Sequence, residues 1–418
     1  MFRIYNLLLY LILLLSPFII IYRLIIKKED LNRFKEKFCF FSHKKPKNKN
    51  VIWFHGSSVG EINSIIPLIE KLEKNENIDT ILITSSTLSS SKVLSKFKFK
   101  KIIHQFFPID LNLFTKKFIN FWSPEIVFFI DSEIWPNMLI NLKKKDIPII
   151  LLNGRITKKT FLKWKILKKF SKEIFSKFTL CLSSNNISKF YLKKLGAINV
   201  KLIGNLKYSQ SENQKIALDS KLKKFILSKK TWCASSTHEN EERICGLAHK
   251  ELKKKYENLF TIIIPRHAER AFMIAKELDQ LNLKVHVHEP TKRIPPDTDI
   301  YIVNTYGMTK SFYNYSSNVF LGGSLIKHGG QNPLEAARYG CNILHGPNVS
   351  NFDEIYYFLN KNKISKKIFN QKTIAIQLAK LFLKRTNSKQ IKNEINFLGK
   401  KILKNTYKEI NLILKNAI

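Results

Sequence analysis

Acidic residues follow two short apolar segments in the first half of the chain, an arrangement that suits acid–base chemistry. Residues 53–61 read Trp-Phe-His-Gly-Ser-Ser-Val-Gly-Glu, which places Glu61 after a small-residue turn at the start of a predicted helix. Asp131 and Glu133 come directly after the apolar segment 126–130. A carboxylate at such a position can accept a proton from a hydroxyl or stabilise a cationic centre. Capping of a helix or turn remains the alternative interpretation, and we interpret His55 as structural.

Cations follow other apolar segments and could bind a phosphate or a carboxylate. Arg155 comes after residues 147–152, Lys207 lies at the predicted boundary between two domains, and Arg266 follows residues 259–264. An arginine can contact a phosphate through two hydrogen bonds. For Lys207 a solvated surface position remains the alternative, because the chain is rich in lysine.

Two segments of the second half are typical of anion binding. Residues 235–242 place hydroxyl groups and backbone amides at the start of a helix, and residues 320–335 combine a strand, a glycine loop and a helix, with Glu335 suited to ribose hydroxyls. The phosphate-binding loop of ATPases and the dinucleotide fingerprint of dehydrogenases are both absent, which disfavours those classes. His238 has no second histidine at zinc-motif spacing, which argues against a zinc site. We expect no metal and no cofactor.

Short apolar segments alternate with amphipathic ones along most of the chain, which predicts α/β domains with parallel sheets. We expect two doubly wound lobes, residues 28–207 and 208–385, with C-terminal helices over 386–418 that pack back on the lobes. Ligands of such sheets bind at the carboxyl ends of strands. The predicted strands are 51–55, 80–84, 126–130, 147–152, 231–234, 259–264, 284–287, 299–303, 319–322 and 342–344.

Residues 1–27 are predicted to anchor the chain to a membrane. No charge occurs from Ile4 to Tyr22, a length close to that of a bilayer-spanning helix. Arg23, Lys27 and Lys28 follow, which predicts that the rest of the chain is cytoplasmic. A helix lying in the membrane interface is the alternative. The segment 161–178 has an apolar stripe with lysines between, and it either packs on its own lobe or lies on an anionic membrane.

The net charge of +40 does not by itself indicate nucleic-acid binding. The two halves, 1–207 and 208–418, carry +23 and +17, so the charge is not concentrated on one domain. Compositional drift, or attraction to an anionic lipid or substrate, explains it better. The five cysteines are scattered without a C-x-x-C pair, which predicts reduced, buried thiols.

Taken together, the motifs resemble those of the 3-deoxy-D-manno-octulosonic acid (Kdo) transferases of lipopolysaccharide synthesis. The resemblance runs from the N-terminal anchor to about residue 355. Seven motifs occur in the order of the family, which is more specific than any one of them. They are Ser58-Val-Gly-Glu61, Glu133-Ile-Trp-Pro-Asn137, Asn205-Leu-Lys207, Ser236-Thr-His238, Pro265-Arg-His267, Gly322-Gly-Ser324 and Asn332-Pro-Leu-Glu335.

This resemblance implies a GT-B fold and a metal-independent, inverting transfer of Kdo from CMP-Kdo to a lipid A precursor at the inner membrane. It implies that Glu61 is the general base and that Asp131 and Lys207 stabilise the transition state. The first lobe would bind the acceptor through Ser57, Ser58, Gly60, Glu133 and Arg155. The second would bind CMP-Kdo through Ser236, Pro265, Arg266, His267, Tyr306, Gly307, Met308, Gly322, Gly323, Ser324, Asn332, Pro333, Leu334 and Glu335.

The sequence departs from the family pattern at a few positions. Asn304 and Met308 replace two acids of one segment, Gln331 stands where the family usually has His, and Asp131 stands where it usually has Glu. Other readings stay open. One is a sugar-nucleotide epimerase or a transferase of another acidic sugar, and the other is a non-enzymatic basic protein that binds RNA or anionic lipid.

Overall fold

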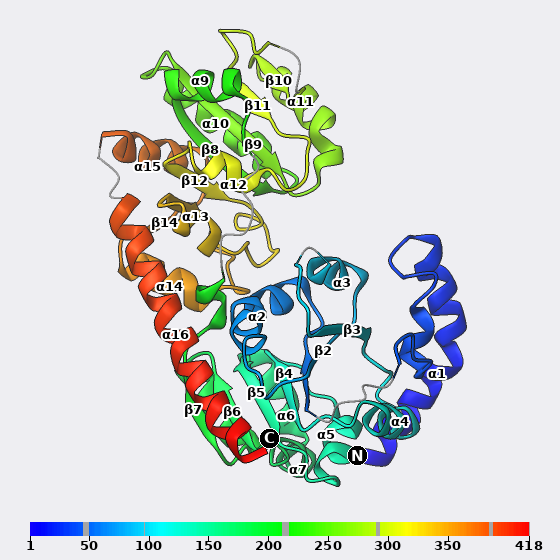
Figure 1. The fold of residues 1–418 in the computed structure, drawn as a ribbon. Coiled ribbons are helices and arrows are strands. Elements are labelled where there is room, and N and C mark those ends of the chain that lie inside the picture. Colours follow the sequence, from blue (N-terminus) through cyan, green and yellow to red (C-terminus); the bar gives the residue numbers. More distant parts are fainter. Residues whose placement is uncertain (45–49, 96, 211–216, 290–292, 384–387, 418) are drawn as a thin grey trace. The chain divides into compact units, whose positions relative to one another are not determined.

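A computed structural model of the 418-residue chain (Figure 1) describes residues 1–44, 50–95, 97–210, 217–289, 293–383 and 388–417. The chain forms two compact units. The first comprises Met1–Ser211 and Leu398–Ile418, and the second Glu212–Phe397. Each has a parallel seven-stranded sheet and a hydrophobic core of its own.

The sheet of the first unit has the strand order β3-β2-β1-β4-β5-β6-β7. The chain moves outward from β1 in one direction and then returns to continue from β4 in the other. The carboxyl ends of β1 and β4 therefore flank a topological switch point, where α/β sheets bind ligands. The strands are β1 (Val51–His55), β2 (Thr80–Ser85), β3 (Ile102–Phe106), β4 (Ile126–Ile130), β5 (Ile149–Gly154), β6 (Leu180–Ser183) and β7 (Val200–Leu202).

Every residue of β1, β2, β4, β5 and β6 is buried, as expected for central strands of a parallel sheet covered on both faces. Helices connect successive strands, and the apolar helix α1 runs along the β3 side of this unit (Figure 1). The helices are α1 (Phe2–Ile25), η1 (Phe34–Phe38), α2 (Val59–Leu72), α3 (Leu88–Leu94), α4 (Asn112–Trp122), α5 (Pro136–Lys143), α6 (Lys158–Ile166), α7 (Lys168–Phe175), α8 (Asn186–Leu195) and η2 (Leu206–Ser209).

The sheet of the second unit repeats this plan with the strand order β10-β11-β9-β8-β12-β13-β14, which puts its switch point between β8 and β12. The strands are β8 (Lys230–Thr237), β9 (Leu259–Pro265), β10 (Val285–Val287), β11 (Ile300–Ile302), β12 (Asn318–Leu321), β13 (Asn342–His345) and β14 (Ser365–Lys367). The helices are α9 (Ser220–Ser228), α10 (Glu241–Lys253), η3 (Ala268–Arg270), α11 (Ala271–Asp279), α12 (Thr309–Tyr313), α13 (Leu334–Arg338), α14 (Asp353–Lys361) and α15 (Gln371–Leu383).

The C-terminal region differs in detail from the expectation. A single helix, α16 (Ser388–Ala417), follows α15, and the unit boundary falls within it, after Phe397. The expected boundary between residues 385 and 386 lies outside the described residues. The sequence-based boundary at residue 207 is close to the division after Ser211.

The periodic segment 161–178 contains parts of two helices, α6 and α7, which are separated by Leu167. Phe161 stacks on Tyr191, and Trp164 contacts Phe175. One face of the segment thus packs on its own unit, while Leu162 and Ile166 stay exposed.

Candidate active site

Glu61 is fixed at the carboxyl end of β1 by the first turn of α2. Ser58 caps this helix, and its hydroxyl accepts the Glu61 N–H and donates to Oε1 of the same residue at 2.8 Å. The Ser57 N–H donates to Oε2 at 2.7 Å. Capping, the alternative interpretation from the sequence, is therefore present, and it orients the carboxylate. Gly60 leaves open space at the start of the helix, since an added Cβ would meet nothing nearer than 3.9 Å.

The environment of Glu61 raises the pKa of its carboxyl group. Burial raises the pKa of Glu61 to about 7, the charges of Glu133 and Asp131 raise it too, and the hydrogen bonds from Ser58 and Ser57 oppose the shift. A carboxylate with such a pKa is half ionised near neutrality and is a stronger base than an ordinary glutamate. This is the property required of a general base.

Glu133, in contrast, is held as an anion. The Trp135 indole N–H donates to Oε2 at 2.8 Å, and Nε2 of His55 lies 3.3 Å from the same oxygen. Burial alone would raise the pKa of Glu133, but the contacts with His55, Ser57 and Trp135 bring it below the usual value. His55 is fully buried and also bonds Thr84 through Nδ1 at 2.9 Å, which agrees with the structural interpretation of this histidine.

Asp131 follows β4 in a left-handed conformation, with φ of 60°. Lys207 donates to its Oδ2 at 3.5 Å, and the backbone N–H of Arg155 donates to its carbonyl at 3.2 Å. Burial raises the pKa of Asp131, while the charges of Lys207 and Arg155 counteract that effect. The structure thus brings Asp131, Lys207 and Arg155 together at the carboxyl edge of the first sheet.

Two asparagines hold Lys207 in place. Oδ1 of Asn205 accepts the Lys207 N–H at 3.0 Å, and Oδ1 of Asn153 accepts the Leu206 N–H at 2.9 Å. Asn153 is the last residue but one of β5 and has φ of 56°, a conformation that asparagine tolerates better than most residues. Residues 205–207 thus form a turn that holds Lys207 beside Asp131.

The motif 133–137 is hydrogen-bonded to the apolar helix α1 through its last residue, Asn137. Asn137 donates its backbone N–H to Asp110 and its side-chain N–H to Asn6 of α1, at 2.9 and 2.8 Å. Asp110 also accepts the hydroxyl of Tyr5 at 2.7 Å. Sequence reasoning missed this cluster, because the aspartate and the α1 residues lie in segments without a recognisable motif.

In the second unit, the glycine loop after β12 is not open to a ligand in the way that the pattern predicted. The backbone amides of Gly323 and Ser324 donate to the carboxylate of Glu241, a residue that the sequence did not single out as a site residue. The hydroxyl of Ser324 donates to Leu321 and accepts the Gly346 N–H. The expected anion cradle is thus filled by the side chain of the protein itself.

A histidine cluster lies beside this loop. The rings of His238 and His328 are 4.3 Å apart, the ring of His267 is 6.2 Å from that of His238, and Nε2 of Gln331 lies 3.3 Å from Nε2 of His238. Burial, together with the charges of His328, His267 and nearby arginines, lowers the pKa of His238 to about 4. His238 is therefore neutral at pH 7 and can offer one hydrogen-bond donor.

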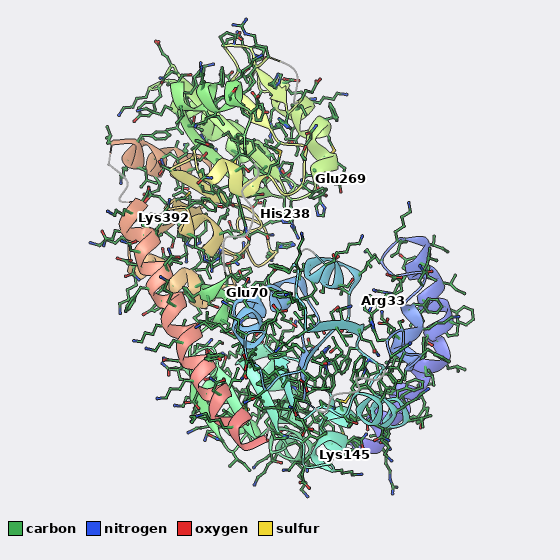
Figure 2. The ribbon with its side chains drawn as sticks, in the orientation of Figure 1. Arg33, Glu70, Lys145, His238, Glu269 and Lys392 are labelled. Atoms are coloured by element: carbon green, nitrogen blue, oxygen red, sulfur yellow. The ribbon has the colours of Figure 1, made fainter. Side chains whose placement is uncertain are left out.

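The residues after β9 offer further groups at the same edge of the sheet. Pro265 is buried, whereas Arg266 is exposed and donates its backbone N–H to Thr237 at 2.9 Å. Tyr306 donates its hydroxyl to Glu269 at 2.7 Å. Figure 2 shows His238 and Glu269 at one edge of the second unit. The side chain of Arg266 is therefore accessible from solvent.

The remaining donor-site candidates lie in turns. Gly307 has φ of 87°, and Met308 precedes the first residue of α12. Oδ1 of Asn332 accepts the Leu334 N–H at 3.1 Å, and Pro333 caps α13, with Glu335 in its first turn. Ser236 lies instead within β8, one residue before its end, and has φ of 55°. All of these turns are at the carboxyl edge of the second sheet.

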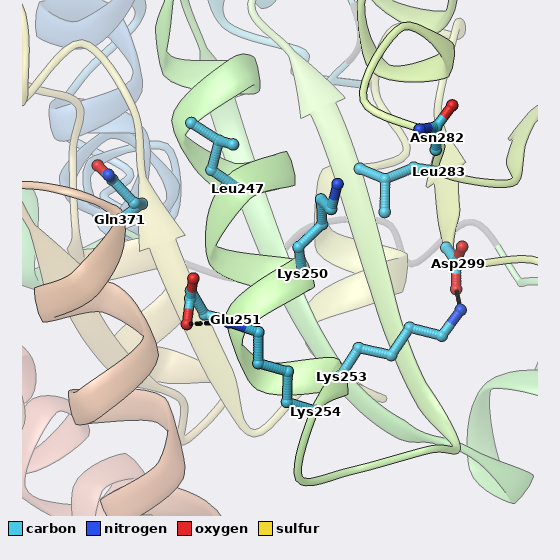
Figure 3. Close-up of a pocket in the computed structure, with 9 residues that line it drawn as sticks. All are labelled: Leu247, Lys250, Glu251, Lys253, Lys254, Asn282, Leu283, Asp299 and Gln371. Atoms are coloured by element: carbon cyan, nitrogen blue, oxygen red, sulfur yellow. Dashed lines mark hydrogen bonds and ion pairs between the residues drawn. The ribbon is translucent and has the colours of Figure 1, made fainter.

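A pocket lies at the opposite, amino edge of the second sheet and contains none of the predicted site residues (Figure 3). Its lining includes Asp299, directly before β11, which is paired with Lys253. The lining residues are Leu247, Lys250, Glu251, Lys253, Lys254, Asn282, Leu283, Asp299 and Gln371. Within the described ranges, no group of three or more His, Cys, Asp or Glu side chains is placed to hold a metal ion.

Comparison with known proteins agrees with the motif pattern. A family model for 3-deoxy-D-manno-octulosonic-acid transferases matches residues 32–210. The chain is 34% identical over 399 residues to the 3-deoxy-D-manno-octulosonic acid transferase of Rickettsia bellii, covering 94% of this chain and 93% of that one. It is 29% identical over 332 residues to the transferase of the same name from Haemophilus influenzae, covering 78% of each chain.

Solved structures resemble the chain in fold. The UDP-GlcNAc 2-epimerase of Neisseria meningitidis, bound to UDP-GlcNAc, has a TM-score of 0.60 and 15% identity, covering 88% of this chain and 100% of that one. At this identity the likeness concerns the fold alone. It confirms the predicted GT-B-like pair of Rossmann-type units, with the apolar N-terminal helix in addition.

Proposed function

Because this chain belongs to the family of 3-deoxy-D-manno-octulosonic acid (Kdo) transferases, we propose that it transfers Kdo from CMP-Kdo to a lipid A precursor. Membership of the family makes the chain a glycosyltransferase. Beyond membership of the family, we propose the donor, the acceptor, the stereochemical course and the roles of the residues.

The observation that supports the proposal most strongly is that two carboxylates of the first unit have pKa values shifted in opposite directions. Glu61 has its pKa raised to about 7, while the pKa of Glu133 is lowered. Groups whose environments push their pKa values apart are typical of acid–base sites. Glu61 is then the base that takes the proton from the acceptor hydroxyl, and Glu133 keeps that base strong.

The transfer is a single inverting displacement. The acceptor oxygen forms a bond to the anomeric carbon of Kdo, the bond from that carbon to the phosphate oxygen breaks, and CMP leaves with the electron pair. The proton of the acceptor hydroxyl goes to Glu61. Lys207 is proposed to stabilise the charged transition state, and Arg266 is proposed to offset the negative charge that develops on CMP.

Asp131 has a second role in the proposal. Its carboxylate stabilises the cationic character of the sugar centre, and its pairing with Lys207 at 3.5 Å opposes the rise in pKa that burial causes. In the second unit, Asn332, Glu335 and the turn 306–308 are proposed to hold the CMP moiety. Ser57, Ser58, Gly60, Glu133 and Arg155 are proposed to face the acceptor.

The helix α1 is proposed to attach the enzyme to the cytoplasmic face of the inner membrane. It is long and apolar enough to cross a bilayer, and most of its side chains are exposed. Its first turns are nevertheless bonded to the unit that carries Glu61, through Tyr5 and Asn6. These bonds favour a helix that lies in the interface, where the lipid acceptor also resides.

The test uses purified full-length protein with CMP-Kdo and a lipid A precursor. We expect release of CMP and, by mass spectrometry, a product heavier by one or more Kdo residues. No CMP release with both substrates present would contradict the proposal. UDP- and GDP-sugars serve as competing donors, and preference for one of them would assign the chain another sugar.

A further inference from the structure

Glu241 occupies a place that a ligand anion takes in other glycine loops. Its side chain is fully buried at the first position of α10. Oε2 accepts the backbone N–H groups of His238 at 3.0 Å and Gly323 at 2.6 Å. Oε1 accepts those of Ser324 at 3.0 Å and Leu325 at 2.9 Å. Four amides that converge on one carboxylate form a nest, with an internal anion as its occupant.

The glycine next to this nest is explained by the same contact. A Cβ on Gly322 would lie 2.8 Å from Oε2 of Glu241 and 2.4 Å from the carbonyl oxygen of Ser236. Both distances are shorter than any side chain allows. The end of β8 and the loop after β12 therefore approach each other so closely that residue 322 must be glycine.

We propose that Glu241 is a positioning residue of the donor site, which fixes the turn of His238 and the glycine loop relative to each other. This inference rests on the proposed function. The fixed turn presents the His238 ring to Gln331 and His328, and the fixed loop leads into the segment 332–335. Without the carboxylate, the four amides would be buried without an acceptor, and the loop would leave its position.

Calorimetric titration of the full chain with CMP tests this inference, since it requires no transfer. In Glu241→Gln the side chain keeps its shape, but an NH2 group faces two backbone N–H donors. The matched control is Asp299→Asn, because Asp299 is also a buried acid of the second unit and also accepts a backbone N–H, from Lys284 at 3.0 Å. It lies at the opposite edge of the sheet (Figure 3).

We expect Glu241→Gln to weaken CMP binding about tenfold or more and Asp299→Asn to change it less than twofold, although both lower the melting temperature. Gly322→Ala, which displaces the same carboxylate from the other side, should weaken CMP binding like Glu241→Gln. Unchanged CMP affinity in folded Glu241→Gln, or equal weakening in Asp299→Asn, would overturn the inference.

If Glu241→Gln does not fold, Gly322→Ala and Glu241→Asp are compared with Asp299→Asn in the same titration, with the same two deciding outcomes. The wild-type chain separates the inference from the proposed function. CMP binding without Kdo transfer would contradict only the function. A wild-type chain that binds no CMP would overturn both.

Discussion

The amine of Lys207 lies 3.5 Å from the carboxylate of Asp131, although the two residues are 76 positions apart and follow strands β7 and β4. In the described part of the chain, the second oxygen of Asp131 has no hydrogen-bond partner. The contact with Lys207 is thus the main compensation for burying this charge.

Lys207→Ala should therefore lower the rate of Kdo transfer by about 10²–10³, the usual effect of removing one preorganised group from a charged transition state. Lys207→Arg should restore part of the rate. The matched control is Lys201→Ala, which breaks the exposed pair of Lys201 with Glu409 and should change the rate less than twofold. Equal losses for Lys207→Ala and Lys201→Ala would show that the position of the cation does not matter.

Glu133→Gln should shift the pH dependence of transfer. The reactive form of Glu61 is the carboxylate, so kcat/KM should rise with pH and level off above the pKa of about 7. The charge of Glu133 raises that pKa. Its neutralisation should move the rising limb to lower pH and weaken the base, which initial rates from pH 5 to 9 would show. A limb that stays at the wild-type position would exclude the coupling.

Glu61→Gln should change stability with a defined sign. The folded-state pKa of Glu61 is above its unfolded value, so folding favours the protonated carboxyl. Wild-type stability from this group falls as pH rises from about 4.5 to about 7, and the uncharged glutamine avoids that loss. The melting temperature of the variant relative to wild type should therefore be higher at pH 8 than at pH 5. The same difference at both values would contradict the raised pKa.

The position of α1 can be tested by labelling. Arg3 lies just before Tyr5 and Asn6, which bond the first unit. All five native cysteines are buried, so Arg3→Cys can be made in the native chain. We expect a membrane-impermeant thiol reagent to leave this cysteine unmodified in intact cells and to modify it after lysis. Lys28→Cys, after the other end of α1, serves as the control. Labelling of Arg3→Cys in intact cells would mean that the helix crosses the membrane.

The central strands could be predicted from the sequence, because β1, β4 and β9 are apolar runs in a chain of alternating segments. Four strands could not, namely β3, β6, β7 and β14. β7 and β14 have three residues each, two of them exposed, and β3 and β6 lack a long apolar run. Such strands form because they pair with the edge of the preceding strand. This tertiary contact cannot be recognised from the residues of the strand alone.

Parts of the candidate site were predictable for a similar reason. Glu61, Asp131 and Arg266 each follow a strong strand, so their place at a carboxyl edge follows from the pattern. Glu241 was not predictable as the occupant of the glycine loop, since its partner Gly323 is 82 positions away and an acid in the first turn of a helix is commonplace. The pairing of Asn137 with Asp110 depends likewise on tertiary structure.

The most direct test of the account measures transfer and donor binding in one variant, Glu61→Gln. Single-turnover transfer of Kdo to the lipid A precursor should fall by about 10²–10⁴, the usual contribution of a general base. The affinity for CMP, measured by calorimetry on the same sample, should stay within twofold of wild type. Transfer at close to the wild-type rate in a variant that still binds CMP would contradict the assignment of Glu61 as the base.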